Sequence, residues 1–251
     1  MARLGSIVRF LSSELRIRKI PDSSRNGLQI STSKEVRKIG FAVDASVAVF
    51  EKAARQGCDL VVVHHGLFWR GKRDISGVTA KRVAFLRRAG MGLYACHLPL
   101  DMHPEYGNNI VLARMLGLTR IERFGRYHGI TIGYKGRFKR PVRLRRIASV
   151  LKRGIRNGCV VLPYGKKSIR SVGIVSGRGS SLFADAVKER IDCFLTGEMP
   201  HESVVEARDL DVSVVLGGHY STETVGVRAL MPLLREKFGV KTVFIDAPTS
   251  I

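Results

Sequence analysis

The feature that most constrains the fold is a pattern of short apolar runs and amphipathic stretches that occurs twice in the 251-residue chain. The segment from Val36 aligns with the segment from Ile169 without a gap, at a constant offset of 133 residues. Five of the first 24 aligned positions are identical, and the apolar runs follow in the same order. We interpret this pattern as an imperfect internal duplication.

Each copy predicts strand, helix, strand, helix and strand. Short β-branched runs are typical of buried strands, and apolar residues at helical spacing are typical of helices. The predicted elements are 39–43, 47–56, 60–63, 80–88 and 92–96 in the first copy, and 172–175, 181–190, 193–196, 200–208 and 212–216 in the second. This alternation favours α/β layers with mostly parallel strands. A helix at 230–238 and a strand at 242–245 complete the chain. We expect an N-terminal α/β lobe over 1–122 and a C-terminal lobe over 123–251.

The charge is strongly positive and unevenly spread. The formal net charge is +22, and the stretch 123–184 contains 16 Lys and Arg but no Asp or Glu. Such a field attracts polyanions, with nucleic acid or nucleotides as candidates. A solvated surface, or adaptation to high internal salt or to acidic partners, explains the same charge. The aromatic residues of the stretch either stack bases or belong to the core: Tyr127, Tyr134, Phe138 and Tyr164.

The cysteines and the apolar runs limit the class of protein. None of the four cysteines forms a CxxC pair, which favours reduced, buried thiols over disulfides or a thiolate metal site. No apolar run reaches the roughly 20 residues needed to cross a bilayer. The start of the chain, 1–15, predicts an amphipathic helix and lacks the features of a secretory signal. We therefore expect a cytoplasmic protein without a membrane partner.

Polar residues that suit metal binding follow the predicted strands. They are His64, His65, His97, Asp101, Glu198 and His219. In open α/β sheets ligands bind beyond the carboxyl ends of strands, so the positions indicate a site. Singly, each histidine has another interpretation as a capping or core residue. Together the clusters predict metal binding.

The spacing within each cluster suggests roles. Adjacent His64 and His65 on an extended chain point to opposite sides, which suits two metals in one cavity. Asp101 has two carboxylate oxygens and could bridge two ions. His219 and Glu223 share a face at a helix start. His103 is either functional or part of the turn before a predicted helix at 110–116. Ligands of this kind suit zinc, iron, manganese or cobalt.

Five sequence blocks resemble the NIF-three-like dinuclear metal family, whose members are named GTP cyclohydrolase 1 type 2 homologs. The blocks are RNGLQI from Arg25, VVVHHGLFW from Val61, HLPLDMHPEYGNN from His97, FLTGEMPH from Phe194 and GHYSTE from Gly218. The resemblance implies two similar, interlinked α/β lobes with a dinuclear metal site in the cleft between them, and a toroidal homohexamer. It assigns the metal ligands to His64, His65, Asp101, His219 and Glu223. It places His97 and Glu198 beside the ligands or the substrate. The basic stretch 123–184 departs from the family pattern.

Three functions follow from these observations. The first is a metal-dependent hydrolase of a nucleotide, similar to GTP cyclohydrolase, in which Glu198 or His201 moves protons. The sequence contains no GxxxxGK[ST] loop for a triphosphate, so Lys and Arg of the basic stretch would hold it. The second is a protein that binds single-stranded nucleic acid. The third is a metal-handling protein without turnover.

Overall fold

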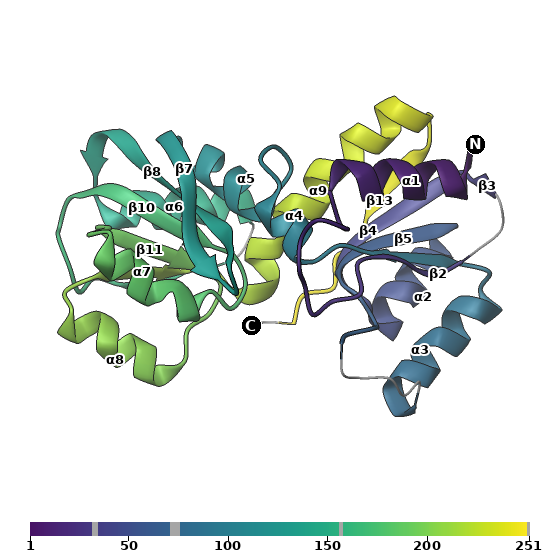
Figure 1. Cartoon of the computed structure of the whole chain (residues 1–251), viewed down its shortest axis with the longest axis horizontal. Coiled ribbons are helices and arrows are strands. Elements are labelled where there is room, and N and C mark those ends of the chain that lie inside the picture. Colours follow the sequence, from purple (N-terminus) through teal and green to yellow (C-terminus); the bar gives the residue numbers. More distant parts are fainter. Residues whose placement is uncertain (32–34, 71–75, 156–157, 250–251) are drawn as a thin grey trace. The chain divides into compact units, whose positions relative to one another are not determined.

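The computed structural model describes residues 1–31, 35–70, 76–155 and 158–249. Its strands and helices alternate along much of the chain (Figure 1). The strands are β1 (Ala2–Arg3), β2 (Gly27–Ile30), β3 (Glu35–Val36), β4 (Lys38–Asp44), β5 (Leu60–His65), β6 (Gly92–Ala95), β7 (Thr119–Tyr127), β8 (Ile130–Val142), β9 (Val160–Leu162), β10 (Ile169–Val175), β11 (Cys193–Thr196), β12 (Ser213–Leu216) and β13 (Lys241–Phe244). The helices are α1 (Leu4–Glu14), α2 (Val47–Arg55), α3 (Gly77–Arg88), α4 (Leu98–Met102), α5 (Asn108–Met115), α6 (Leu144–Ile155), the 3₁₀ turn η1 (Ser180–Leu182), α7 (Phe183–Lys188), α8 (His201–Asp209) and α9 (His219–Phe238).

The chain forms two compact units. Unit 1 comprises Met1–Leu100 and Val227–Ala247, and unit 2 comprises Asp101–Gly226 with Pro248–Ile251. The boundary falls inside α9, whose first turns belong to unit 2 and whose remainder belongs to unit 1. These are spatial units, and the boundary between lobes at residues 122 and 123 stays a prediction.

Unit 1 contains a five-stranded sheet in the order β13-β4-β5-β6-β2. Strands β13, β4, β5 and β6 run parallel, and β2 runs antiparallel to β6. Helices cover both faces (Figure 1). Side chains alternate between faces along a strand. On β5, Val61 and Val63 pack against α2 and α3, in a cluster that includes Phe50 and Leu86. On the other face, Phe10 of α1 meets Phe238 of α9 with ring centroids 5.5 Å apart.

Unit 2 contains a six-stranded sheet in the order β7-β8-β10-β11-β12-β9. Its central strands β10, β11 and β12 are parallel, and β8 and β9 pair with them in the antiparallel sense. On β11, Cys193 and Leu195 join the core under α5 and α6. The intervening Phe194 contacts Phe183 of α7, with ring centroids 5.9 Å apart. Both faces of the central strands are therefore buried, which explains their continuous apolar runs.

The predicted mixed α/β fold is confirmed, and all predicted helices and strands except the final helix lie within a few residues of their expected positions. The largest difference is the final helix. It was expected at 230–238 but begins at His219, because the polar segment after β12 forms the first turns of α9. Three of the four cysteines are buried: Cys58, Cys96 and Cys193. The predicted burial is therefore confirmed for these three.

One aspartate braces the start of a parallel strand pair in each unit. In unit 1, Asp59 Oδ2 accepts hydrogen bonds from the amides of Arg37 and Lys38, at 2.7 and 3.0 Å. In unit 2, Asp192 Oδ2 accepts hydrogen bonds from the amides at 170 and 171, both at 2.9 Å. Each residue of the second set follows its counterpart by 133 positions. The same local device therefore recurs at the sequence offset of the predicted duplication.

None of the helices in the described part of the chain has the length and apolar character that crossing a membrane requires.

Candidate metal centre

Three imidazole rings meet where β5 and β6 end in unit 1. The ring centroids of His64 and His65 lie 4.7 Å apart, and those of His64 and His97 lie 5.1 Å apart. One potential ligand nitrogen from each ring lies within 4.8 Å of the others. We call His64, His65 and His97 the histidine cluster. The expectation that His64 and His65 point to opposite sides was wrong, because their ring centroids lie only 4.7 Å apart.

Each ring of the histidine cluster is held through its Nδ1 atom. The acceptors are the Cys96 carbonyl for His64 at 3.0 Å, the Asp44 carboxylate for His65 at 2.8 Å and the Asp22 carboxylate for His97 at 3.0 Å. A carbonyl or an ionised carboxylate only accepts, so Nδ1 carries the proton in each neutral ring. The lone pair is then on Nε2. Fixing a tautomer in this way is how proteins prepare a histidine to ligate a metal.

Asp22 does more than hold one ring. Its Oδ1 accepts from the amide of Ser24 at 2.9 Å, and its Oδ2 accepts from the amide of Leu98 at 3.0 Å and from Asn26 Nδ2 at 2.9 Å. Burial alone would raise the pKa of this carboxyl, but the bonds from His97, Asn26 and Ser24 lower it below its ordinary value. Asp22 is therefore a carboxylate that fixes the turn before β2 against the chain that follows β6.

Trp69 lies beside the histidine cluster. Its ring centroid is 5.0 Å from that of His97, edge to face, and 6.4 Å from that of His65. Its Nε1 donates to the Gly66 carbonyl at 3.1 Å. Trp69 is the only tryptophan of the chain, so its fluorescence reports on this site alone.

Unit 2 contains a second cluster, formed by Glu198, His219 and Glu223, which we call the His219 cluster. His219 Nδ1 lies 3.0 Å from Glu198 Oε1, and its Nε2 lies 3.3 Å from Glu223 Oε1. His219 and Glu223 stand one helical turn apart on α9, so the predicted shared face is confirmed. Arg178 Nε also donates to Glu198 Oε1, at 2.8 Å.

These contacts shift two pKa values in opposite directions. The hydrogen bond with Glu223 is the main cause that raises the pKa of His219 to about 9. Burial alone would raise the pKa of Glu198, but the bonds from His219 and Arg178 lower it. The His219 cluster therefore concentrates negative charge around one imidazole and suits a cation.

Gly177 allows the backbone to approach the His219 cluster. It follows β10 with a φ of +61°, a conformation that favours glycine. A Cβ placed on it would overlap Glu223 Oε1 and lie 3.2 Å from His219 Nε2. The Gly177 amide donates to Thr222 Oγ1 at 3.0 Å. A larger residue here would displace the ligand pair.

Asp101 is buried in unit 2, where it is held by residues that the sequence analysis did not select. Its Oδ1 accepts from Asn108 Nδ2 at 2.8 Å and from Ser176 Oγ at 2.9 Å. Asn109 Oδ1 in turn accepts from the Ser176 amide at 2.7 Å. The network ties the end of β10 to α4 and α5. The adjacent asparagines at the start of α5 are the sequence signal that could have revealed it.

The donor chemistry of both clusters fits a divalent metal. Imidazole nitrogens and carboxylate oxygens suit zinc, iron, manganese or cobalt without selecting one. The thiols of Cys58 and Cys193 are unsuited as metal ligands, because burial raises the pKa of Cys58 to about 11 and raises that of Cys193 as well. His64, His65 and His97 would hold an ion in unit 1, and His219 and Glu223 would ligate one from unit 2.

Two other predicted residues lie apart from these contacts. His201 is exposed at the first position of α8. His103 accepts, through Nδ1, from the amides of Glu105 and Tyr106 at 3.2 and 3.1 Å. These hydrogen bonds close the turn before α5. They favour the interpretation of His103 as part of that turn.

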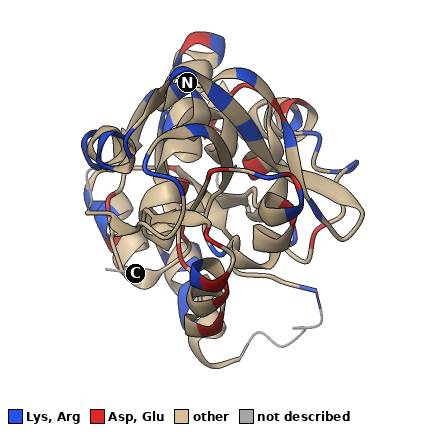
Figure 2. Ribbon diagram, turned by 90° about the vertical axis from the view of Figure 1, so that its left-hand side faces the viewer, with Lys and Arg blue, Asp and Glu red and all other residues tan. Residues whose placement is uncertain are grey.

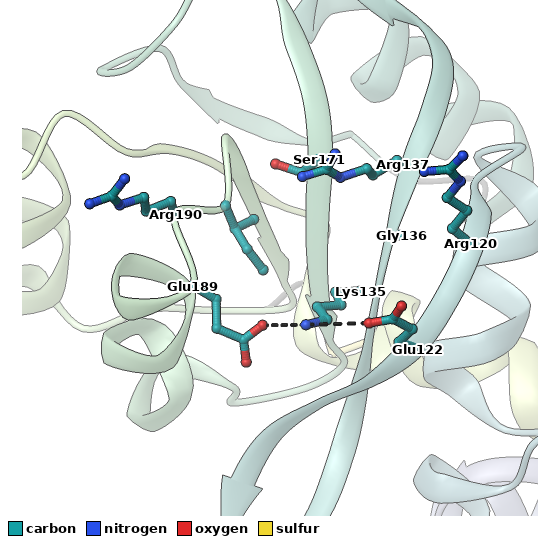
Figure 3. Close-up of a pocket in the computed structure, with 9 residues that line it drawn as sticks. Arg120, Glu122, Lys135, Gly136, Arg137, Ser171, Glu189 and Arg190 are labelled. Carbon is teal, nitrogen blue, oxygen red and sulfur yellow. Dashed lines mark hydrogen bonds and ion pairs between the residues drawn. The ribbon is translucent and has the colours of Figure 1, made fainter.

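A pocket elsewhere in unit 2 has a different electrostatic character (Figure 3). Its volume is about 250 Å³, and Arg120, Lys135 and Arg137 are among its lining residues. Lys135 Nζ lies 2.6 Å from Glu189 Oε2 and 3.5 Å from Glu122 Oε2. The hydrogen bond with Glu189 raises the pKa of Lys135. The lysine is already neutralised by two carboxylates, so the pocket is a weak candidate for an anion site.

Comparison with known proteins gives matches over nearly the whole chain. The family described as Duf34/NIF3 (NGG1p interacting factor 3) matches residues 2–250. A protein of Pyrococcus horikoshii named GTP cyclohydrolase 1 type 2 homolog is 47% identical over 246 residues, 98% of each chain. One of the same name from Archaeoglobus fulgidus is 41% identical over 248 residues, 99% of each chain. The crystal structure of TTHA1606 from Thermus thermophilus superimposes with a TM-score of 0.89 at 40% identity, covering 99% of this chain and 100% of that one.

Proposed function

The chain belongs to the Duf34/NIF3 family, and on that premise we propose that it is a hydrolase that depends on two divalent metal ions and acts on a nucleotide or a related phosphorylated substrate. His64, His65, Asp101, His219 and Glu223 would supply the ligands of one dinuclear centre, with His97 and Glu198 beside them. When bound, a pair of such ions activates water and stabilises the charge that develops during hydrolysis.

The observation that carries the proposal is the preparation of the histidine cluster. Each of the three imidazoles brings one ring nitrogen to a common region, and each ring is fixed at Nδ1 by an oxygen acceptor. A purely structural role for His64, His65 and His97 would not require their ligand atoms to lie within 4.8 Å of one another.

The chain's own residues provide the remaining functions. Glu198 holds His219 by Nδ1, and its low pKa keeps it ionised near neutral pH. It could accept a proton from a reacting group within hydrogen-bond reach. His201, exposed at the start of α8, is the second candidate for proton transfer. Asp22 and Asp44 orient the imidazoles.

The relatives' name directs the first substrate test to GTP. Purified protein should be analysed for bound metals, stripped with a chelator and reloaded with one metal at a time. Each form is then incubated with GTP and a panel of other nucleotides, and the products are separated by chromatography. We expect turnover that requires metal and depends little on salt. Stoichiometric, exchangeable metal without any turnover would instead favour a metal-handling protein.

A pair of variants separates proton transfer from general damage. Glu198→Gln keeps all five proposed ligands, and Glu202→Gln is a matched control at an exposed position on α8. We expect Glu198→Gln to retain some metal and to lose turnover by about 100-fold or more, the range for a general acid or base. Unchanged turnover in the Glu198→Gln variant would show that Glu198 does not transfer a proton in the reaction.

We also propose that the two units descend from one duplicated α/β element. The recurrence of the aspartate brace at Asp59 and Asp192, and of the parallel strand runs β4-β5-β6 and β10-β11-β12, supports this. A toroidal homohexamer follows only from the family resemblance. Its test is the molar mass in solution by light scattering, where a monomer or dimer at micromolar concentration would contradict it.

A further inference from the structure

We propose that the exposed face of α6 in unit 2 binds the phosphate backbone of double-stranded nucleic acid. The face borders a groove of about 780 Å³ between the end of β8 and the helix. Four arginines line it: Arg143, Arg145, Arg146 and Arg153. All four are exposed, and Lys152 is exposed on the same helix. Arg156, which follows in the sequence, lies outside the described residues.

The cations of this face are available to a ligand. The sequence from 123 to 184 contains no acidic residue, and Lys and Arg positions outnumber Asp and Glu over the ribbon (Figure 2). Within the described residues, no carboxylate pairs with Arg143, Arg145 or Arg146. Arg153 donates to the neighbouring Ser149 hydroxyl at 2.9 Å, which orients it without neutralising it. This is the opposite of the pocket at Lys135, where two glutamates already compensate the charge (Figure 3).

The burial of the apolar side of α6 argues against a membrane surface. A basic amphipathic helix binds lipid by inserting its apolar face. Here the apolar residues are already part of the unit 2 core: Leu144, Ile147, Leu151 and Ile155 are each at most 8% exposed. The outer side carries mainly cations, so the helix can attract a polyanion but has little apolar surface to insert.

The aromatic residues argue for a duplex over a single strand. Proteins that hold single strands stack bases on exposed aromatic rings. No aromatic side chain lines the α6 groove. Tyr134 and Phe138 are 5% and 8% exposed, so the structure places them in the core. The face therefore offers contacts to phosphates and none to bases.

The length of the charged stripe matches the charge density of a duplex. Arg145 and Arg153 are eight positions apart, about 12 Å along a helix. Over that length a duplex carries about seven phosphates on its two strands, and roughly half of these face one side. The four cations on α6, with Arg143 directly before it, are therefore close to the number that one side of a duplex could engage.

The test measures binding of the full-length protein to a fluorescein-labelled 20-base-pair duplex by fluorescence anisotropy at several salt concentrations. The triple variant Arg145→Gln, Arg146→Gln, Arg153→Gln removes three cations from α6. The matched control Arg55→Gln, Lys81→Gln, Arg87→Gln removes three exposed cations from unit 1. Circular dichroism and thermal melting verify that both remain folded. The three single α6 variants provide a second series if the triple variant unfolds.

We expect the α6 triple variant to flatten the slope of log K against log salt by about three, and each single variant by about one. Affinity at 0.1 M salt should fall more than tenfold, while the control changes less than twofold. Any of three results would overturn the proposal. They are an equal loss of duplex affinity in both triple variants, tighter binding of a single strand than of the duplex, and binding only to phosphatidylserine vesicles. Metal-stripped protein should bind the duplex as before, which separates this inference from the proposed hydrolase.

Discussion

The polar clusters of the two units prepare metal ligands in different ways. In unit 1 the histidine cluster brings three imidazoles together, each fixed at Nδ1 by an acceptor from a neighbouring segment. In unit 2 the His219 cluster places one imidazole between two glutamates, and its pKa rises accordingly. Neutral donors can be preorganised at little electrostatic cost, whereas crowded carboxylates need a cation for compensation. The comparison indicates that unit 1 defines ligand geometry and unit 2 supplies negative charge.

Removing an imidazole from unit 1 is expected to have the largest effect. His65→Ala deletes a ligand, so metal affinity should fall by more than the roughly 100-fold upper range for losing an outer partner. Quenching of Trp69 fluorescence during titration with Co²⁺ measures this directly. His128→Asn is the control, because His128 is exposed at a φ of +44° that asparagine tolerates. Equal affinities of wild type and His65→Ala would contradict the assignment.

Exchanging the partners behind the imidazoles tests whether the units differ. Asp44→Asn and Glu198→Gln each weaken an acceptor at Nδ1 while keeping its shape, and we expect a loss of metal affinity of about 10- to 100-fold. Both exchanges remove one negative charge, but only the imidazole of His219 also contacts a second carboxylate, Glu223, so the loss for Glu198→Gln should shrink more at high salt. Isothermal titration at two ionic strengths checks this. If the loss of metal affinity depends on salt equally in both variants, the proposed difference between the two units is contradicted.

The aspartate brace provides a test of stability. Asp59→Ala and Asp192→Ala each leave two backbone amides without their acceptor, and we expect a loss of about 1–3 kcal/mol of unfolding free energy. Burial would raise the pKa of Asp192, but bonds from Lys166 and from the amides of Ser171 and Arg170 lower it. A lowered pKa stabilises the fold above the ordinary value of 3.8, and this contribution fades as the pH falls below it.

Denaturant melts of the wild type and the Asp192→Ala variant at pH 6 and pH 3 check the sign. The difference between them should be smaller at pH 3. A difference that grows on acidification would contradict the role of the ionised carboxylate.

Replacing His103 is expected to have the smallest effect. His103→Ala removes one acceptor for two turn amides, which should cost about 1 kcal/mol or less. Metal content should not change, since the contacts of His103 are in the turn before α5. The metal content of the purified variant tests this prediction. A clear loss of metal would show that His103 contributes to metal binding.

The sequence predicted the elements well because the strands are buried on both faces and the helices end at strong signals such as Gly57 and Gly90. It also selected His64, His65, His97 and Glu223, which follow strands or share a helix face. It missed Asp22, Asp44 and Ser176. Their importance depends on hydrogen bonds between segments far apart in sequence, such as that of Asp22 with Leu98, 76 positions later. It also misjudged the directions of His64 and His65, whose ring centroids lie only 4.7 Å apart.

The aromatic residues of the basic stretch show the same limit. Tyr134 and Phe138 could be base-stacking or core residues from composition alone. Burial on β8 resolves the ambiguity for these two, because alternate residues of that strand face the core.

The pairing of β13 with β4 has a consequence for how the chain is made. The edge partner of β4 in the unit 1 sheet is the segment Lys241–Phe244, so this side of β4 is paired only after residues 101–226 have been synthesised. During translation, the backbone groups of Ile39 and Phe41 on that side would wait without a partner while all of unit 2 emerges. An unpaired strand edge invites pairing with other chains. Nascent or prematurely terminated chains that stop before residue 241 should therefore depend most on chaperones.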